Sequence, residues 1–247
     1  MSVLDRCGRL PGFLLAALLA GCGITGGGAG SREPDAAARL RIAAVAEASG
    51  QPDVALSMYS AAAAGAPRRG DVQALYAAAL ARNGDLPAAE EVIDRALTLQ
   101  PEDPALLGQS ARNRLAAGDA ESALRLFDRV LAKAPGSARA LSGKGVALDL
   151  TGRATEARES HLAAHALAPE DAVVTNNLAM SLLLSGRPGE AITLLEPLAQ
   201  GRSAPRRIRN NLALARAAAG KMDAATEDLT GQLRPTDLDQ YAALLAP

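Results

Sequence analysis

The chain has 247 residues, of which 49% are hydrophobic but only 2% are aromatic. A core made mainly of alanine and leucine favours closely packed helices over a β-sandwich, whose strands favour β-branched and aromatic side chains. The 26 Lys and Arg residues nearly balance the 27 Asp and Glu residues, so the chain has no global field that would attract nucleic acid.

The first predicted element is a secretion signal over residues 1–21. Two arginines precede an uninterrupted apolar run, Phe13 to Ala20, and Cys22 follows soon after it. A run of this length is too short to span a hydrocarbon core, which takes about 20 helical residues. The segment therefore predicts export rather than a transmembrane helix.

The residues from Leu19 to Cys22 resemble a bacterial lipobox, in which the signal is cleaved before the cysteine and the cysteine is then acylated. This resemblance implies lipidation of Cys22, and Gly23 in place of aspartate implies sorting to the outer membrane, facing the periplasm. The alternative is an ordinary cysteine near a generic cleavage site. If Cys22 is lipidated, residues 22–35 form the lipidated cysteine and a flexible Gly-rich tether.

Small residues recur with a period of 34 residues through most of the remaining chain. The turn glycines are Gly50, Gly84, Gly118, Gly152, Gly186 and Gly220. Five residues after them stand Ala55, Ala89, Ala123, Ala157, Ala191 and Ala225, and seven residues before them stand Ala43, Ala77, Ala111, Gly145, Ala179 and Ala213. Repetition at one period indicates internal duplication. We expect the twelve residues that flank the glycines to form the packing seam between paired helices.

The turn chemistry predicts where each helix pair begins and ends. Glycine adopts the left-handed conformation that closes a first helix, and Asp85 and Asp119 are suited to cap second helices. Prolines that would end the second helices stand at Pro67, Pro101, Pro135 and Pro169. In the fifth unit Pro197 falls inside the expected second helix, so we expect that helix to end early or to kink.

This period, with its Ala-x-x-x-aromatic element at Ala55 to Tyr59 and Ala123 to Phe127, resembles the tetratricopeptide repeat. In the fourth unit the residue at the aromatic position is His161, which is polar. The resemblance implies an all-α superhelical solenoid of about six helix-turn-helix repeats over residues 36–234. Residues 235–247 are interpreted as a C-terminal cap that closes the stack.

The residues give little support for catalysis or metal binding. The only histidines, His161 and His165, have the four-residue spacing that lets two ligands reach one metal on a helix, but no third ligand is indicated. The segment also lacks the glutamate that zinc proteases carry beside the first histidine. The alternative is a partly packed pair within the fourth unit. We expect no enzymatic activity, no metal and no cofactor.

The repeat resemblance implies that the first helices line a concave face that binds protein partners. Carried over by position, the contact residues are Arg112, Arg139, Asn176, Asn177, Arg207, Asn210 and Asn211. An asparagine amide both donates and accepts hydrogen bonds, as recognition of a peptide backbone requires, although it is also tolerated as an ordinary exposed residue. The basic run over residues 202–221 is either a solvated face or a site for an acidic segment or a terminal carboxylate.

The lipobox, the tether, the repeats and the ending from Asn210 to Leu233 together resemble the TadD lipoproteins of the tight-adherence (Flp) pilus system. This resemblance implies an outer-membrane lipoprotein that binds the secretin or other pilus-assembly components, without nucleic acid or a small-molecule substrate. The alternatives are a general periplasmic repeat lipoprotein, such as a type IV pilotin or a barrel-assembly adaptor, and, less favoured, a metal-dependent enzyme.

Overall fold

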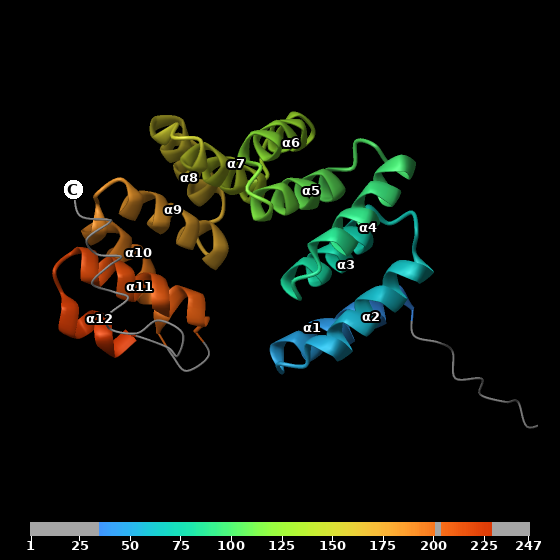
Figure 1. Cartoon of the computed structure of the whole chain (residues 1–247), viewed down its shortest axis with the longest axis horizontal. Coiled ribbons are helices and arrows are strands. Elements are labelled where there is room, and N and C mark those ends of the chain that lie inside the picture. Colours follow the sequence, from blue (N-terminus) through green and yellow to red (C-terminus); the bar gives the residue numbers. More distant parts are fainter. Residues whose placement is uncertain (1–34, 201–203, 229–247) are drawn as a thin grey trace, which may run out of the picture. The chain divides into compact units, whose positions relative to one another are not determined.

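The computed structural model describes residues 35–200 and 204–228, and these residues form twelve α-helices and no strand (Figure 1). The first helices of the six hairpins are α1 (Ala36–Ala48), α3 (Gly70–Arg82), α5 (Pro104–Ala116), α7 (Ala138–Leu150), α9 (Ala172–Leu184) and α11 (Arg206–Ala218). The second helices are α2 (Pro52–Gly65), α4 (Leu86–Leu99), α6 (Ala120–Lys133), α8 (Ala154–Leu167), α10 (Pro188–Ala199) and α12 (Met222–Asp228). The predicted all-α fold of paired helices is confirmed.

Several sequence predictions lie outside the described residues. They are the signal at residues 1–21, the acylated Cys22, nearly all of the tether and the cap at residues 235–247. Within the described part of the chain, no helix is both long enough and apolar enough to cross a membrane.

The predicted turn chemistry is present at every hairpin. All six turn glycines have a positive φ, between 70° and 86°, a conformation that costs glycine little because it has no Cβ. The Asp85 carboxylate accepts a hydrogen bond of 3.1 Å from the amide of Ala88, and the Asp119 carboxylate accepts one of 3.0 Å from Ser122. Both aspartates therefore cap second helices as predicted.

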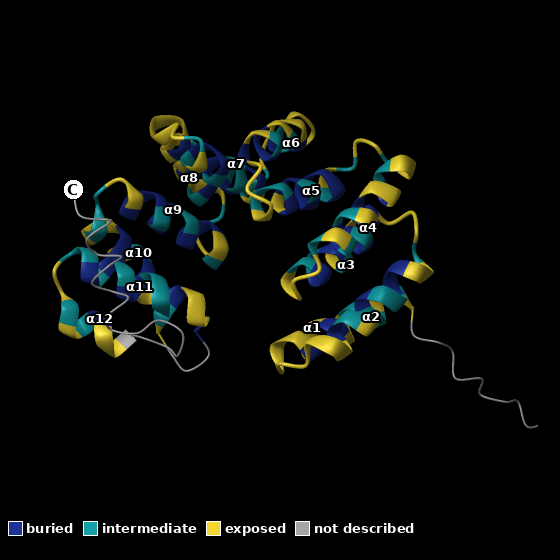
Figure 2. Cartoon of the chain, in the orientation of Figure 1, coloured by how far each residue is buried: buried dark blue, intermediate teal, exposed yellow. Residues whose placement is uncertain are grey.

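The twelve small residues of the predicted seam are all buried. Figure 2 shows the buried residues gathered where helices face one another, with exposed residues on the outer sides. Side chains no larger than a methyl group let the two helices of a hairpin approach closely, and neighbouring hairpins then cover the remaining apolar surface. Along one side of the stack, α3, α5, α7 and α9 each contact the first helix of the next hairpin.

The fifth hairpin departs from the pattern where its sequence predicts a departure. Helix α10 has 12 residues, whereas α2, α4, α6 and α8 each have 14. Pro197 lies inside α10, two residues before its end. Because proline has no amide hydrogen to donate to the preceding turn, the helix does not reach the length of its counterparts. The prediction of an early end is confirmed.

Candidate functional site

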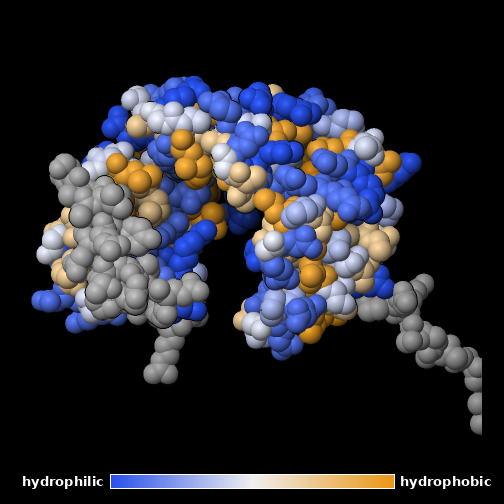
Figure 3. Space-filling model, viewed as in Figure 1, coloured by the Kyte–Doolittle hydropathy of each residue, from blue (hydrophilic) through white to orange (hydrophobic). Residues whose placement is uncertain are grey.

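A groove of about 910 Å³ lies along the first helices of the second to fifth hairpins, and Arg207 at the start of α11 also contributes to its wall. Its apolar lining includes Leu75 of α3 and Val173 of α9, which are 41% and 44% exposed. Figure 3 shows the hollow on this side, with hydrophilic and hydrophobic residues on its wall. Such a surface suits a ligand that has both polar and apolar groups.

The groove wall contains Arg112, Arg139, Asn177 and Arg207 of the seven predicted contact residues. The other three, Asn176, Asn210 and Asn211, are outside that wall. Whether any of the seven contacts a partner stays a prediction.

Asn176 is 3% exposed, and its Oδ1 accepts a hydrogen bond of 2.8 Å from Nδ2 of Asn211. The adjacent Asn177 is half-buried, and its Nδ2 donates to the Ser142 hydroxyl at 3.1 Å. Successive residues of a helix point about 100° apart, and of these two asparagines only Asn177 is part of the groove wall. The structure therefore places Asn176 and Asn211 in the joint between α9 and α11, away from a partner at the groove.

Arg112 is held in the groove by neutral amide groups. Its Nε and Nη2 donate to Oε1 of Gln109 at 3.0 and 2.8 Å, and Nε2 of Gln109 donates to Oδ1 of Asn113 at 2.8 Å. Gln109 and Asn113 are 3% and 2% exposed. The three residues stand three and four positions apart on α5, on one side of the helix. The amide pair therefore fixes the guanidinium without neutralising its charge.

Other cations surround Arg112. Arg112 is exposed to solvent at the groove surface, and the protein atoms around it exclude part of the surrounding water. This desolvation, with the positive charges of Arg139 and Arg82, lowers the pKa of Arg112 to about 10. The guanidinium is still protonated at neutral pH, so Arg112 carries a positive charge in the groove.

Arg139 and Arg82 differ from Arg112 because each has an acidic partner. Nε of Arg139 lies 2.9 Å from the Asp171 carboxylate, and Arg82 forms an ion pair with Glu47. Burial acts to raise the pKa of Asp171, but the hydrogen bonds from Arg139 and from backbone amides hold that pKa below its usual value. Asp171 therefore stays ionised and offsets much of the Arg139 charge.

Sequence reasoning missed Arg82 and Gln109 at this site. Arg82 lies 30 residues before Arg112, which does not match the 34-residue period, so no repeat pattern places it in the same groove. Gln109, in contrast, could have been identified from the sequence by its spacing from neighbouring polar residues. Polar residues spaced by three and four on one helix, as in Gln109, Arg112 and Asn113, predict a side-chain network.

The basic run over residues 202–221 does not form a single surface in the described part of the chain. Arg207 lines the groove, whereas Arg216 pairs with Glu196 at 2.9 Å. Nε of Arg209 is buried without a hydrogen-bond partner among the described residues. The adjacency of these residues in sequence therefore did not predict one shared role.

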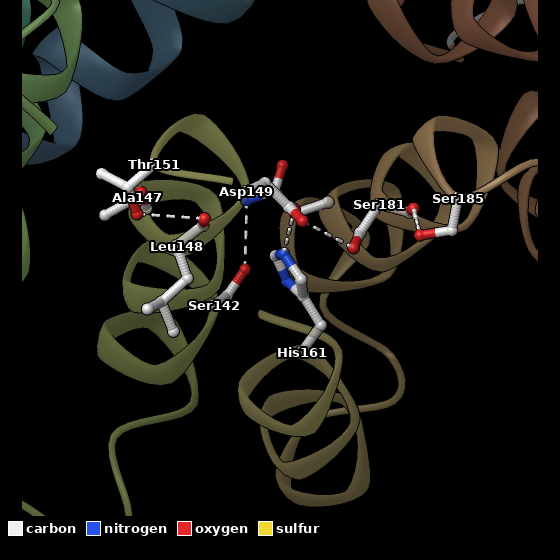
Figure 4. Close-up of polar contacts among 9 residues, drawn as sticks. Ser142, Ala147, Leu148, Asp149, Thr151, His161, Ser181 and Ser185 are labelled. Carbon is white, nitrogen blue, oxygen red and sulfur yellow. Dashed lines mark hydrogen bonds and ion pairs between the residues drawn. The ribbon is translucent and has the colours of Figure 1, made fainter. Parts of the chain in front are cut away.

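The two histidines have separate partners in the structure, and Figure 4 shows those around His161. His161 is fully buried, with its Nε2 3.0 Å from Oδ2 of Asp149, whose Oδ1 accepts from the Ser181 hydroxyl at 3.2 Å. Nδ1 of His165 lies 3.2 Å from the Thr175 hydroxyl. Among the described residues, no group of three His, Cys, Asp or Glu residues could hold a metal ion.

The order of groups around Asp149 differs from that of a catalytic triad. In a triad the imidazole lies between the nucleophile and the carboxylate. Here the carboxylate lies between serine and histidine, and the histidine has no accessible surface. This network joins α7, α8 and α9, so the interpretation of the histidines as packed residues fits the geometry.

Two sequence profiles described as tetratricopeptide repeat match the chain over residues 46–111 and over residues 109–172 and 176–233. The chain belongs to the tetratricopeptide repeat family. It is a scaffold of the class that binds other proteins. No curated protein sequence matches it significantly.

Solved structures share the fold of this repeat protein. A tetratricopeptide repeat protein from Parabacteroides merdae is 16% identical with a TM-score of 0.63, and the match covers 84% of each chain. A thermophilic repeat protein from Thermus thermophilus is 22% identical with a TM-score of 0.59, over 71% of this chain and 98% of that one. The pilF protein of Pseudomonas aeruginosa is 16% identical with a TM-score of 0.55, over 78% and 88%. At these identities the similarity concerns the fold alone.

Proposed function

We propose that the chain is an outer-membrane lipoprotein that binds the secretin or another protein component during assembly of a tight-adherence (Flp) pilus. The observation that carries this proposal is the order of its segments. A lipobox ending at Cys22 precedes a Gly-rich stretch, which leads to a tetratricopeptide repeat unit with a groove on its first helices. In this proposal acylated Cys22 is the anchor and the groove is the binding surface.

The length of the tether supports a function close to the membrane. Residues 23–34 reach about 40 Å at most, because an extended chain spans about 3.3–3.6 Å per residue. Two or more acyl chains hold a protein on a membrane stably, whereas one does not. A repeat unit anchored in this way would hold its partner near the inner surface of the outer membrane, where a secretin has to assemble.

The anchor is tested by replacing Cys22 with serine in the full-length chain. We expect the wild type to incorporate labelled palmitate and to fractionate with the outer membrane, and Cys22→Ser to lose both properties. Cys7→Ser is the matched control, because Cys7 lies in the segment that is expected to be removed. Outer-membrane fractionation and acyl labelling of Cys22→Ser at the wild-type level would contradict the proposal.

The role in assembly is tested in a strain that lacks the chain. We expect loss of surface Flp pili and of secretin oligomers from the outer membrane, with recovery on expression of the wild type but not of Cys22→Ser. Loss of type IV pili or of outer-membrane barrels, with Flp pili intact, would instead identify a pilotin or a barrel-assembly adaptor.

A further inference from the structure

The charge of the groove is strongly one-sided. Its charged lining residues are four arginines, Arg82, Arg112, Arg139 and Arg207, and one acid, Asp71. That acid is paired with Arg69 of the same hairpin. The chain as a whole is nearly neutral, with a net charge of −1, so the positive groove is a local feature of the first helices.

Arg112 is a groove cation that its neighbours position but do not neutralise. Arg82 and Arg139 each have a carboxylate partner, whereas the guanidinium of Arg112 donates to the neutral side chain of Gln109. Gln109 uses two of the five N–H donors of a guanidinium, and no described acid pairs with Arg112. A carboxylate that entered the groove would therefore meet a positioned and uncompensated cation.

We propose that this groove binds an extended acidic segment of a protein partner, with one aspartate or glutamate side chain seated on Arg112. The inference rests on the proposed function, since it names the chemistry of the partner that the scaffold holds.

The distribution of the arginines favours an internal segment over a chain terminus. They come from α3, α5, α7 and α11, so guanidinium groups line several hairpins, with Arg82 and Arg139 already paired to Glu47 and Asp171. A terminal carboxylate would use only one point of this row, whereas an extended segment places successive acidic side chains along it. Leu75 and Val173 are exposed in the same groove, so the segment should also carry apolar side chains.

The proposal is tested with the full-length protein and a synthetic peptide in which glutamate alternates with valine. The variants are Arg112→Gln, which removes the charge, and Arg112→Lys, which keeps it. Arg95→Gln is the matched control, because Arg95 lies on α4 outside the groove and pairs with Glu91 at 2.8 Å. We expect Arg112→Gln to weaken binding about tenfold, as loss of one charge-assisted hydrogen bond predicts. Arg112→Lys should keep most of the affinity, and Arg95→Gln all of it.

A second peptide, with glutamine in place of glutamate, tests the charge from the ligand side. Its binding should be weaker, and binding of the acidic peptide should weaken as ionic strength rises. Equal affinity for the two peptides, or wild-type affinity of Arg112→Gln, would overturn the proposal. Stronger binding of a single-stranded oligonucleotide or of anionic phospholipid vesicles at Arg112 would also overturn it, because the groove would then recognise phosphate.

Failure of this inference can be distinguished from failure of the proposed function. If deletion of the chain abolishes Flp pili while the two peptides bind equally, only the acidic chemistry is wrong. If acidic-peptide binding depends on Arg112 while deletion leaves Flp pili intact, the groove chemistry holds and the pilus role is wrong.

Discussion

Phe127 in the third hairpin and His161 in the fourth occupy the same position of the repeat, nine residues after their turn glycines. Phe127 is 1% exposed and His161 is fully buried. Each ring lies against a glycine: a Cβ on Gly143 would meet Phe127 at 2.3 Å, and a Cβ on Gly145 would meet His161 at 2.6 Å. Both rings therefore depend on space that an alanine at the facing position would occupy.

The two hairpins differ in the residues that surround these rings. Phe127 belongs to an apolar cluster with Leu107 and Leu124. The His161 ring, in contrast, forms a hydrogen bond with the Asp149 carboxylate. Leu115 stands one period before Asp149, in the third hairpin. In these two hairpins a large ring is buried at the same repeat position, and a glycine leaves the space for each ring. A polar ring is accommodated in the fourth hairpin because Asp149 provides a partner for Nε2 of His161, although Nδ1 is buried without a hydrogen-bond partner among the described residues.

The largest expected effect is at the apolar member of this pair. Phe127→Ala should lower the free energy of unfolding by about 3–5 kcal/mol, because it leaves a cavity beside Gly143 that the helices fill only in part. Urea unfolding followed by circular dichroism measures the change. Leu162→Ala is the control, since Leu162 is 52% exposed on α8. A midpoint shift no larger than that of the control would contradict the assignment of Phe127 to the core.

A smaller effect is expected at the polar member. His161→Leu preserves bulk but removes the hydrogen bond to Asp149, whose side chain is only 13% exposed. The free energy of unfolding should fall by about 1–3 kcal/mol, because the carboxylate loses a buried partner. The variant with Asp149→Leu added should recover part of this loss, since it reproduces the leucine pair of the fifth hairpin, Leu183 and Leu195. Additive losses from the two substitutions would show that the pair is not coupled.

Local rules of the sequence were sufficient to predict the fold. Turn glycines, capping aspartates and helix-ending prolines each act within a few residues, and the 34-residue period shows that the same hairpin is repeated. Pro197 likewise predicted the shorter α10, because a proline limits the helix that contains it. These features require no knowledge of which hairpins approach one another in space.

The candidate site was only partly predictable because it depends on contacts between hairpins. The period identified Arg112 and Arg139 as positions on first helices, but it could not show that Asp171 pairs with Arg139 while Arg112 meets only an amide. It also treated Asn176 and Asn177 as equivalent, although their side chains point in different directions on α9. The partners of Arg139, Asn176 and Asn177 come from neighbouring hairpins, so the repeat position alone did not identify them.

The smallest effect is expected at the joint between α9 and α11, where Asn211 donates to Asn176. Asn211→Ala removes the donor to Asn176, which is 3% exposed, and should lower the free energy of unfolding by about 0.5–1.5 kcal/mol. Asn83→Ala, at an exposed asparagine that ends α3, should leave stability unchanged. Because Asn211 does not line the groove, its variant should bind the acidic peptide at the wild-type level. Weaker peptide binding at unchanged stability would instead make Asn211 a partner contact, as its position in the repeat predicted.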